Sequence, residues 1–253
     1  MLKNNLLRKT IILEIVLLFL GAGIVTGINT NFETTDFCTN NEKITFDIKD
    51  FTPSDDVYIK HNKPEITCNI KYMSIRNEYG IYGSPNWAWD GLIKFDVSSI
   101  PSGAKINSAI LNMYYWSFQD TNPAGRILLL YRPLNNWDET SVTWYTQPSY
   151  ASEPSAFSVV PSSFGWMTWN VTDDVQDFVK GKKDNHGWKI TDEGYWGMPD
   201  IPTTRFHTKD IPEFDDLIPH LEINYKTPRN INIDVGVLGK LPLIQMLLQR
   251  LEI

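Results

Sequence analysis

Residues 91–116 read GLIKFDVSSIPSGAKINSAILNMYYW, and this stretch decides the fold class. Two runs within it, LIKFDV (92–97) and NSAILNMYYW (107–116), are rich in branched and aromatic residues, which favour β-strands. The sequence PSGA (101–104) between them is typical of a turn. Two strands joined by a turn, with no helix between them, indicate a sandwich or barrel and argue against a βαβ fold.

The same alternation of short strands and turns continues on both sides of this stretch. Turn sequences such as NPAG (122–125) and EPSA (153–156) separate the runs. The further segments with the pattern of strands are ITFDI (44–48), DVYIK (56–60), RILLLYR (126–132), SVTWY (141–145), WMTWNV (166–171), WKIT (188–191) and LEINY (221–225). The sequence therefore predicts a single all-β domain over residues 43–226.

One helix is predicted, in TDDVQDFVKG (172–181). Thr172 is the expected N-cap, and Gly181 is the expected stop. Val175, Phe178 and Val179 fall on one face, which can cover an open edge of the core.

Residues 1–27 have the composition of an export signal. Basic residues near the start precede the apolar run IILEIVLLFLGAGIVTG (11–27), which ends in small residues. The alternative is an uncleaved anchor, because this run is near the lower length limit of a spanning helix. Both alternatives export the domain, so the sequence predicts a secreted or cell-surface protein.

Residues 227–253 are predicted to be a linker and a short apolar tail. In LPLIQMLLQRLEI (241–253), apolar residues recur at helical spacing, and the segment is too short to span a bilayer. We expect this amphipathic tail to contact a partner protein, the same domain or a membrane surface; the alternative is a frayed end.

Composition limits the classes of ligand. The net charge of −7 and the lack of a basic stripe argue against nucleic-acid binding. Aromatic residues make up 13% of the chain, which suits either a β core or a surface on which ligands stack.

The two cysteines, Cys38 and Cys68, are predicted to form a disulfide in an exported protein. The alternative is two free thiols, with Cys68 buried.

No catalytic sequence motif is present, and the four histidines lack metal-ligand spacing. A polysaccharide-cleaving enzyme needs only two facing carboxylates, so that class stays an alternative. The candidate carboxylates are Asp55, Asp56, Asp90, Asp138 and Glu139.

Two further sites follow from residue type alone. Asp55 and Asp56 offer oxygen ligands for a structural Ca²⁺, the only cofactor that we expect. Asn170-Val-Thr172 is a glycosylation sequon, and the alternative is that Asn170 is satisfied within the fold.

The order of five segments resembles the DNRLRE domain, which is also classed as carbohydrate-binding module family 96 and recurs in methanogen surface proteins and disaggregatase-related proteins. The matching segments are FTPSDDVYI (51–59), the opening stretch 91–116, RPLNNWDETSVTW (132–144), WNVTDDVQDFVKGKKDNHGWKI (169–190) and PHLEINY (219–225). The string that names the family does not occur here, and the Trp of Gly187-Trp188 stands where an aliphatic residue is more usual.

This resemblance implies a jelly-roll-like β-sandwich and, for some members, binding of acidic polysaccharide. It supplies no catalytic residue. The recurring positions are expected to be core and turn residues: Phe95, Asp96, Ile106, Ala109, Leu111, Trp137, Val142, Trp144, Val171 and Gly187.

Aromatic residues outside these motifs are the candidates for stacking on sugar rings: Trp87, Trp89, Trp116, Tyr195 and Trp196. Trp87 and Trp89 are two positions apart, so in an extended segment both face the same side. The alternative is that they cap the open end of the sandwich. The basic residues available to recognise an acidic ligand are Arg76, Lys94, Arg126, Arg132 and Arg205.

The sequence thus predicts an exported, non-catalytic carbohydrate-binding module for a cell-surface or extracellular polysaccharide. The alternatives are a structural or adhesion domain that contacts protein, and a polysaccharide-cleaving enzyme.

Overall fold

The computed structural model describes residues 46–77, 88–194, 202–211 and 214–227. Residues 1–27, Cys38 and the tail from residue 228 onward therefore lie outside the described residues. Within the described residues, no helix is long and apolar enough to cross a membrane.

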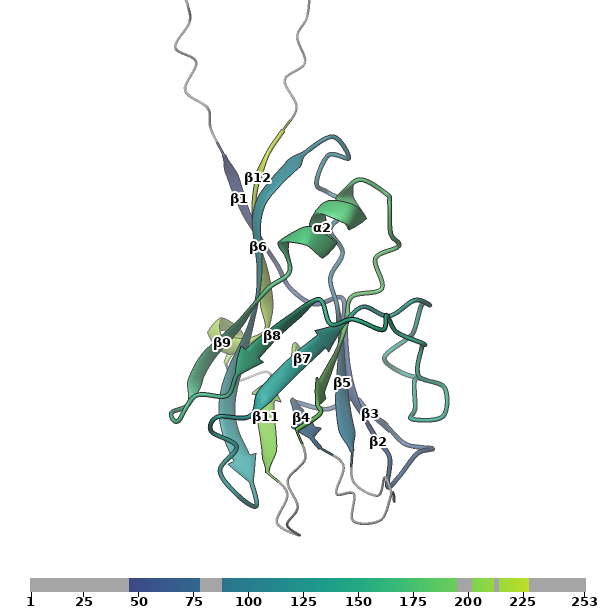
Figure 1. Ribbon diagram of the computed structural model, residues 1–253, viewed down its shortest axis with the longest axis vertical. Helices are drawn as coiled ribbons and strands as arrows, with labels where there is room; N and C mark the ends of the chain where they lie inside the picture. Colours follow the sequence, from purple (N-terminus) through teal and green to yellow (C-terminus); the bar gives the residue numbers. More distant parts are fainter. Residues whose placement is uncertain (1–45, 78–87, 195–201, 212–213, 228–253) are drawn as a thin grey trace, which may run out of the picture. The chain divides into compact units, whose positions relative to one another are not determined.

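The described residues form twelve strands and two short helical elements (Figure 1). These are β1 (Asp47–Phe51), β2 (Asp55–Lys60), β3 (Thr67–Cys68), β4 (Tyr72–Arg76), β5 (Trp89–Lys94), β6 (Lys105–Gln119), β7 (Ile127–Tyr131), β8 (Ala156–Val159), β9 (Gly165–Asn170), α2 (Thr172–Val179), β10 (Trp188–Asp192), β11 (Thr203–His207), the 3₁₀ element η1 (Asp215–Leu217) and β12 (His220–Lys226).

The strands belong to one curled antiparallel sheet, which forms half of a barrel. Its order is β1-β12-β6-β11-β4-β5-β10-β7-β8; β9 pairs with β6, and β2 pairs with both β3 and β5. Figure 1 shows β1, β12 and β6 running together beside α2. The predicted all-β class with one short helix is confirmed.

The main core lies inside the curl because the strands alternate apolar and polar residues. Along β6, Leu111, Met113 and Tyr115 are buried, whereas the residues between them are partly exposed. Trp169 of β9 packs on Phe206 of β11 and donates its indole N–H to the carbonyl oxygen of Leu128 at 3.1 Å. Strands that are distant in sequence thus share one interior.

A second, smaller core lies on the opposite side of β2 and β5. Val57, Ile59 and Leu92 pack there under Trp137 and Val142 of the segment 133–155. The indole N–H of Trp137 donates to the carbonyl oxygen of His186 at 2.8 Å.

The predicted strand SVTWY (141–145) is wrong, because its backbone closes locally into turns. Val142 N–H donates to the Asp138 carbonyl, and the amides of Thr143 and Thr146 each bond the other residue's hydroxyl. The alternation of Val142 and Trp144 reflects packing on the second core, and not a sheet.

The helix α2 buries Val175, Phe178 and Val179, as its spacing predicts. Its N-cap is Val171 and not Thr172, so that prediction is wrong. The Thr172 hydroxyl instead accepts the Ala109 amide of β6 at 2.9 Å, which ties the helix to the sheet.

Candidate functional site

Three neighbouring strands place a group of polar and aromatic side chains on one outer face of the sheet. In β11, Arg205 lies between Ser74 of β4 and Ser117 of β6, and Thr203 lies between Arg76 and Gln119. Directly paired residues point to the same side of a sheet. We call this set the β4–β11–β6 face; it consists of Tyr72, Ser74, Arg76, Trp116, Ser117, Gln119, Thr203, Arg205 and His207.

The alternate residues of the same strands fix this face by filling the main core. Met73, Ile75, Tyr115 and Phe206 are all buried there. A shift of register by one residue would exchange the two faces, so the apolar residues hold the polar ones outward.

Several buried polar atoms of the face have no hydrogen-bond partner among the described residues. The buried atoms of this kind on the face include Ser74 Oγ, Trp116 Nε1, Ser117 Oγ, Thr203 Oγ1, Arg205 Nε and His207 Nδ1. Such groups cost about 1–3 kcal/mol each when they stay unpaired. Their concentration on three adjacent strands marks this face as a place where an external ligand can complete the bonds.

Aromatic rings and guanidinium groups lie together on the face. The ring of Tyr72 is 6.3 Å from that of Trp116, and the Arg205 guanidinium lies 5.3 Å from the Tyr72 ring centre. Arg76 likewise lies 5.1 Å from the ring centre of Trp89. A cation at such a distance from a ring centre is attracted to the ring electrostatically.

The two arginines differ in their electrostatic surroundings. Arg76 is buried and forms an ion pair with Asp120 at 3.3 Å; burial lowers the pKa of its guanidinium, and Asp120 opposes that shift. Asp120 itself has a left-handed φ of 65°, which ends β6 beside Arg76. Arg205 is partly exposed and, among the described residues, has no carboxylate at ion-pair distance; its Nη2 donates to Gln119.

Trp89 borders this face but is enclosed. Only 9% of it is exposed, its indole N–H donates to Asn62 Oδ1 at 2.9 Å, and Lys60 and Arg76 lie over its ring. This geometry corresponds to the capping alternative for Trp89. Trp87 lies outside the described residues, as do Tyr195 and Trp196, so their stacking role stays a prediction.

The other predicted basic residues lie elsewhere and have acidic partners. Lys94 pairs with Asp55 at 3.2 Å, Arg132 with Asp174 at 3.7 Å, and Arg126 with buried Asp192. Of the five basic candidates, the structure brings Arg76 and Arg205 together, beside Trp116.

The carboxylate candidates are engaged within the fold. Asp55 and Asp56 are consecutive in β2, so their side chains point to opposite faces. Asp56 Oδ2 accepts the Lys209 amide at 2.7 Å, and Asp90 pairs with buried Lys189 at 3.0 Å. In the part of the chain that the structure describes, no three His, Cys, Asp or Glu residues are grouped as metal ligands, so the calcium site rests on residue type alone.

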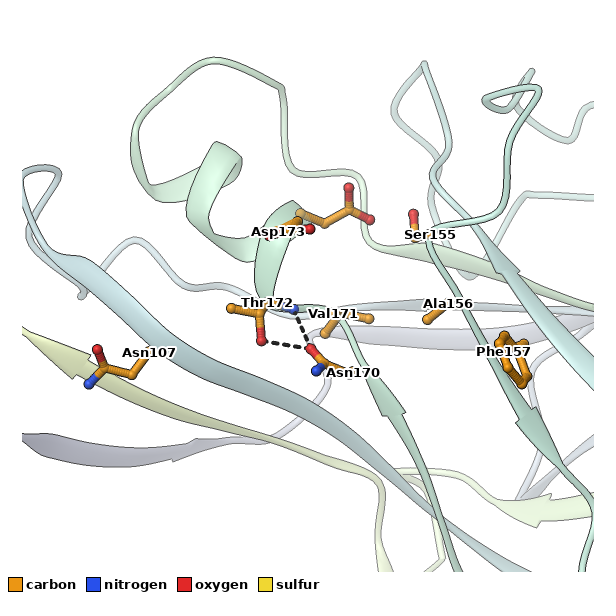
Figure 2. Close-up of a pocket in the computed structure, with 9 residues that line it drawn as sticks. Asn107, Ser155, Ala156, Phe157, Asn170, Val171, Thr172 and Asp173 are labelled. Carbon is orange, nitrogen blue, oxygen red and sulfur yellow. Dashed lines mark hydrogen bonds between the residues drawn. The ribbon is translucent and has the colours of Figure 1, made fainter.

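Asn170 lies at a surface pocket of about 550 Å³ beside the start of α2 (Figure 2). Its side-chain oxygen accepts both the amide and the hydroxyl of Thr172, at 3.1 and 2.7 Å. The oxygen is thus satisfied within the fold, while the residue is exposed. Glycosylation of Asn170 stays a prediction.

Cys68 is buried opposite Tyr58 in the β2–β3 pair, and it has no disulfide partner among the described residues. Because Cys38 lies outside the described residues, the predicted disulfide stays a prediction.

Sequence reasoning missed more than half of the face: Tyr72, Ser74, Ser117, Gln119, Thr203 and His207. A signal was present, since YMSIR (72–76) and TTRFH (203–207) each place apolar residues between polar or aromatic ones. Both segments are only five residues long, which makes the pattern weak.

A curled β-sheet whose outer face carries rings, guanidinium groups and unpartnered hydroxyls defines a binding domain for a polar ligand with apolar surfaces. The sequence comparisons agree with this class. Residues 47–222 match the sequence model of carbohydrate-binding module family 96, and the chain belongs to that family. No curated protein matches the chain.

Proposed function

We propose that this protein is an exported, non-catalytic module that holds an acidic polysaccharide against the β4–β11–β6 face. The observation that carries the proposal is the group of unpartnered polar atoms beside the rings of Tyr72 and Trp116. Sugar hydroxyls donate and accept hydrogen bonds, and the C–H faces of sugar rings pack on aromatic rings. Membership of a carbohydrate-binding family supports the same class of ligand.

An acidic ligand is favoured by Arg205. It is the partly exposed guanidinium of the face, and its Nε has no hydrogen-bond partner among the described residues. A guanidinium binds carboxylate and sulfate oxygens through two parallel bonds, which are stronger than bonds between neutral groups. Because Ser74 and Thr203 are fully buried, the ligand first meets Arg205, Tyr72 and Trp116, and reaches the hydroxyls once Arg205 turns outward.

The proposal that the module does not cleave its ligand rests on the carboxylates. The Asp90 carboxylate is buried against Lys189, and Glu139 bonds the Asp56 amide and the Lys209 ammonium. The apolar segment 11–27 supports export, and we propose residues 43–226 as the binding domain.

Affinity electrophoresis of the full chain against polygalacturonate, hyaluronan, xylan and dextran tests this proposal. We expect retardation by an acidic polymer, with Arg205→Gln weakening binding by about 10–100-fold, since a hydrogen bond to a charged group contributes about 1.5–3 kcal/mol. Arg132→Gln is the matched control, because it removes the same charge outside the face. Equal losses in both variants, or no binding to any polymer, would contradict the proposal.

A reducing-sugar assay on the same samples tests the non-catalytic role. If the purified protein still released reducing ends at a constant specific activity, the polysaccharide-cleaving alternative would be favoured.

A protein-contacting role is the second candidate. It is favoured by the exposed apolar side chains of Ile127, Phe157 and Val159 on β7 and β8, at the edge of the sheet. If this role were correct, Phe157→Ser would abolish co-sedimentation with cell-surface protein, and removal of glycans would not.

A further inference from the structure

A second group of aromatic side chains lies on the outer faces of β9, β6 and β12. Trp166 is 39% exposed, and its indole contacts two perpendicular rings: Tyr114, with centroids 5.4 Å apart, and His220, at 4.8 Å. Asn112 and Thr168, a directly paired amide and hydroxyl, lie one step along the same strands. We call these five residues the Trp166 surface.

Register places these side chains on the side of the sheet away from the main core. Trp166 pairs with Tyr114, and His220 pairs with Asn112. The intervening residues Met113 and Met167 are buried in the main core. The perpendicular neighbours hold the indole in one orientation, so little side-chain entropy is lost when a ligand packs on it.

Ring contacts through His207 link the Trp166 surface to the β4–β11–β6 face, and the Phe214 ring stacks on His207 at 5.8 Å. The imidazole of His207 lies 5.5 Å from the ring of Tyr114 on one side and 5.5 Å from the ring of Trp116 on the other. It is only 4% exposed, and its Nδ1 has no hydrogen-bond partner in the part of the chain that the structure describes. Burial lowers the pKa of His207, and a bond to the Leu217 backbone opposes that shift. An unpartnered polar atom thus lies at the junction of the two surfaces.

The distance between the surfaces exceeds one sugar unit. Arg205 is on β11 and Trp166 on β9, with β6 between them. Two strand spacings correspond to about 10 Å. A ligand that contacts both residues must therefore be a chain of several units.

We propose that the Trp166 surface is a second subsite for the same polysaccharide, and that the protein recognises an internal stretch of the chain and not its end. The inference rests on the proposed function. The two subsites recognise different chemistry: Arg205 binds the charged groups, whereas Trp166 packs on the C–H face of a neighbouring unit while Asn112 and Thr168 bond its hydroxyls.

Two consequences separate this arrangement from a single compact site. Affinity rises with oligosaccharide length until both subsites are filled. The contribution of Arg205 falls as salt is raised, because exposed charges are screened, whereas the contribution of Trp166 does not.

The test uses the full chain and size-fractionated oligosaccharides, from disaccharides to decasaccharides, of whichever polymer in the electrophoresis set binds best. Titration calorimetry gives the dissociation constants of wild type, Trp166→Ala and Arg205→Gln. Tyr145→Ala is the matched control, since it removes an exposed ring from the segment 133–155. Melting temperatures identify any variant that does not fold, and Trp166→Phe then replaces the alanine variant.

We expect Trp166→Ala to weaken decasaccharide binding about tenfold at both low and high salt and to leave disaccharide binding unchanged. Arg205→Gln should weaken both, and more at low salt. Equal loss at every length, or no loss at any length, would overturn the second subsite while leaving the proposed function in place. If wild type binds no polymer, the proposed function itself fails.

Discussion

Asp56 connects three separate parts of the fold through its buried carboxylate and its backbone amide. Its replacement by Asn tests whether the carboxylate binds a proton on folding. Asp56 is fully buried at the start of β2; its Oδ2 accepts the Lys209 amide, and its own amide donates to Glu139 Oε2 at 2.9 Å. Within the described residues, its Oδ1 has no hydrogen-bond partner. Burial is the main reason that the pKa of Asp56 rises from 3.8 to about 7, partly offset by the bond from Lys209.

The sign of the pH dependence follows from this raised pKa. Between pH 3.8 and about 7 the folded protein keeps a proton on Asp56 that the unfolded chain has released. Stability therefore falls as pH rises through this window, by up to ~1.4 kcal/mol per pH unit, and the full loss is about 4 kcal/mol as an upper bound. Above pH 7 the loss is complete.

Asp56→Asn keeps an oxygen for the Lys209 amide and removes the ionisation. We expect the variant to gain stability over wild type by a few kcal/mol at pH 8 and to lose that advantage at pH 4.5. Urea unfolding at several pH values, followed by tryptophan fluorescence, measures both curves. A difference that is constant across this range would refute the reasoning, because it would show that Asp56 does not bind a proton on folding.

Two further changes test packing and charge burial. Gly187 has a left-handed φ of 71°, and a Cβ there would overlap the carbonyl oxygen of Ile93. Gly187→Ala should therefore lower the free energy of unfolding in urea by about 2–4 kcal/mol. An unchanged free energy would contradict the close approach of the two backbones. Lys189→Met leaves the buried carboxylate of Asp90 without its cation and should lower the free energy of unfolding by about 3–5 kcal/mol. Adding Asp90→Asn should restore much of that stability, as measured by calorimetric melting. If the double variant were no more stable than Lys189→Met alone, the result would argue against the pairing.

The strands that could be predicted from sequence are those with strong apolar patterns. β6 appears as a long run because its buried residues alternate with partly exposed ones, and β10 and β12 alternate apolar with polar residues. The segment 141–145 shows the limit of the method: Val142 and Trp144 alternate because both pack on the second core, while the backbone bonds locally. The spacing of apolar residues indicates which side chains are buried. It does not show whether the backbone bonds a neighbouring strand or closes into a local turn.

The candidate site was harder to predict because it depends on pairing. Arg76, Trp116 and Arg205 could be selected by residue type, but nothing in the sequence says that β11 lies between β4 and β6. Ser74 and Thr203 look like ordinary strand residues until the register places them beside Arg205 and Arg76. Lys94, Arg126 and Arg132 are equally basic, and only the structure shows that they lie outside the face, paired with Asp55, Asp192 and Asp174.

The energetics of the β4–β11–β6 face give a reason for its composition. A domain is stable by only about 5–15 kcal/mol, and several buried hydroxyl and N–H groups without partners consume a substantial part of that margin. Apolar residues such as Val at Thr203 would fit an extended strand and avoid the loss. Elsewhere in the described part of the sheet, the Arg126–Asp192 pair and the Trp169 indole are satisfied, whereas Asp56 Oδ1 and Thr204 Oγ1 are single exceptions on separate strands. On this face, the polar atoms without partners lie beside aromatic rings and a partly exposed guanidinium. This arrangement suits a ligand that supplies the missing hydrogen bonds.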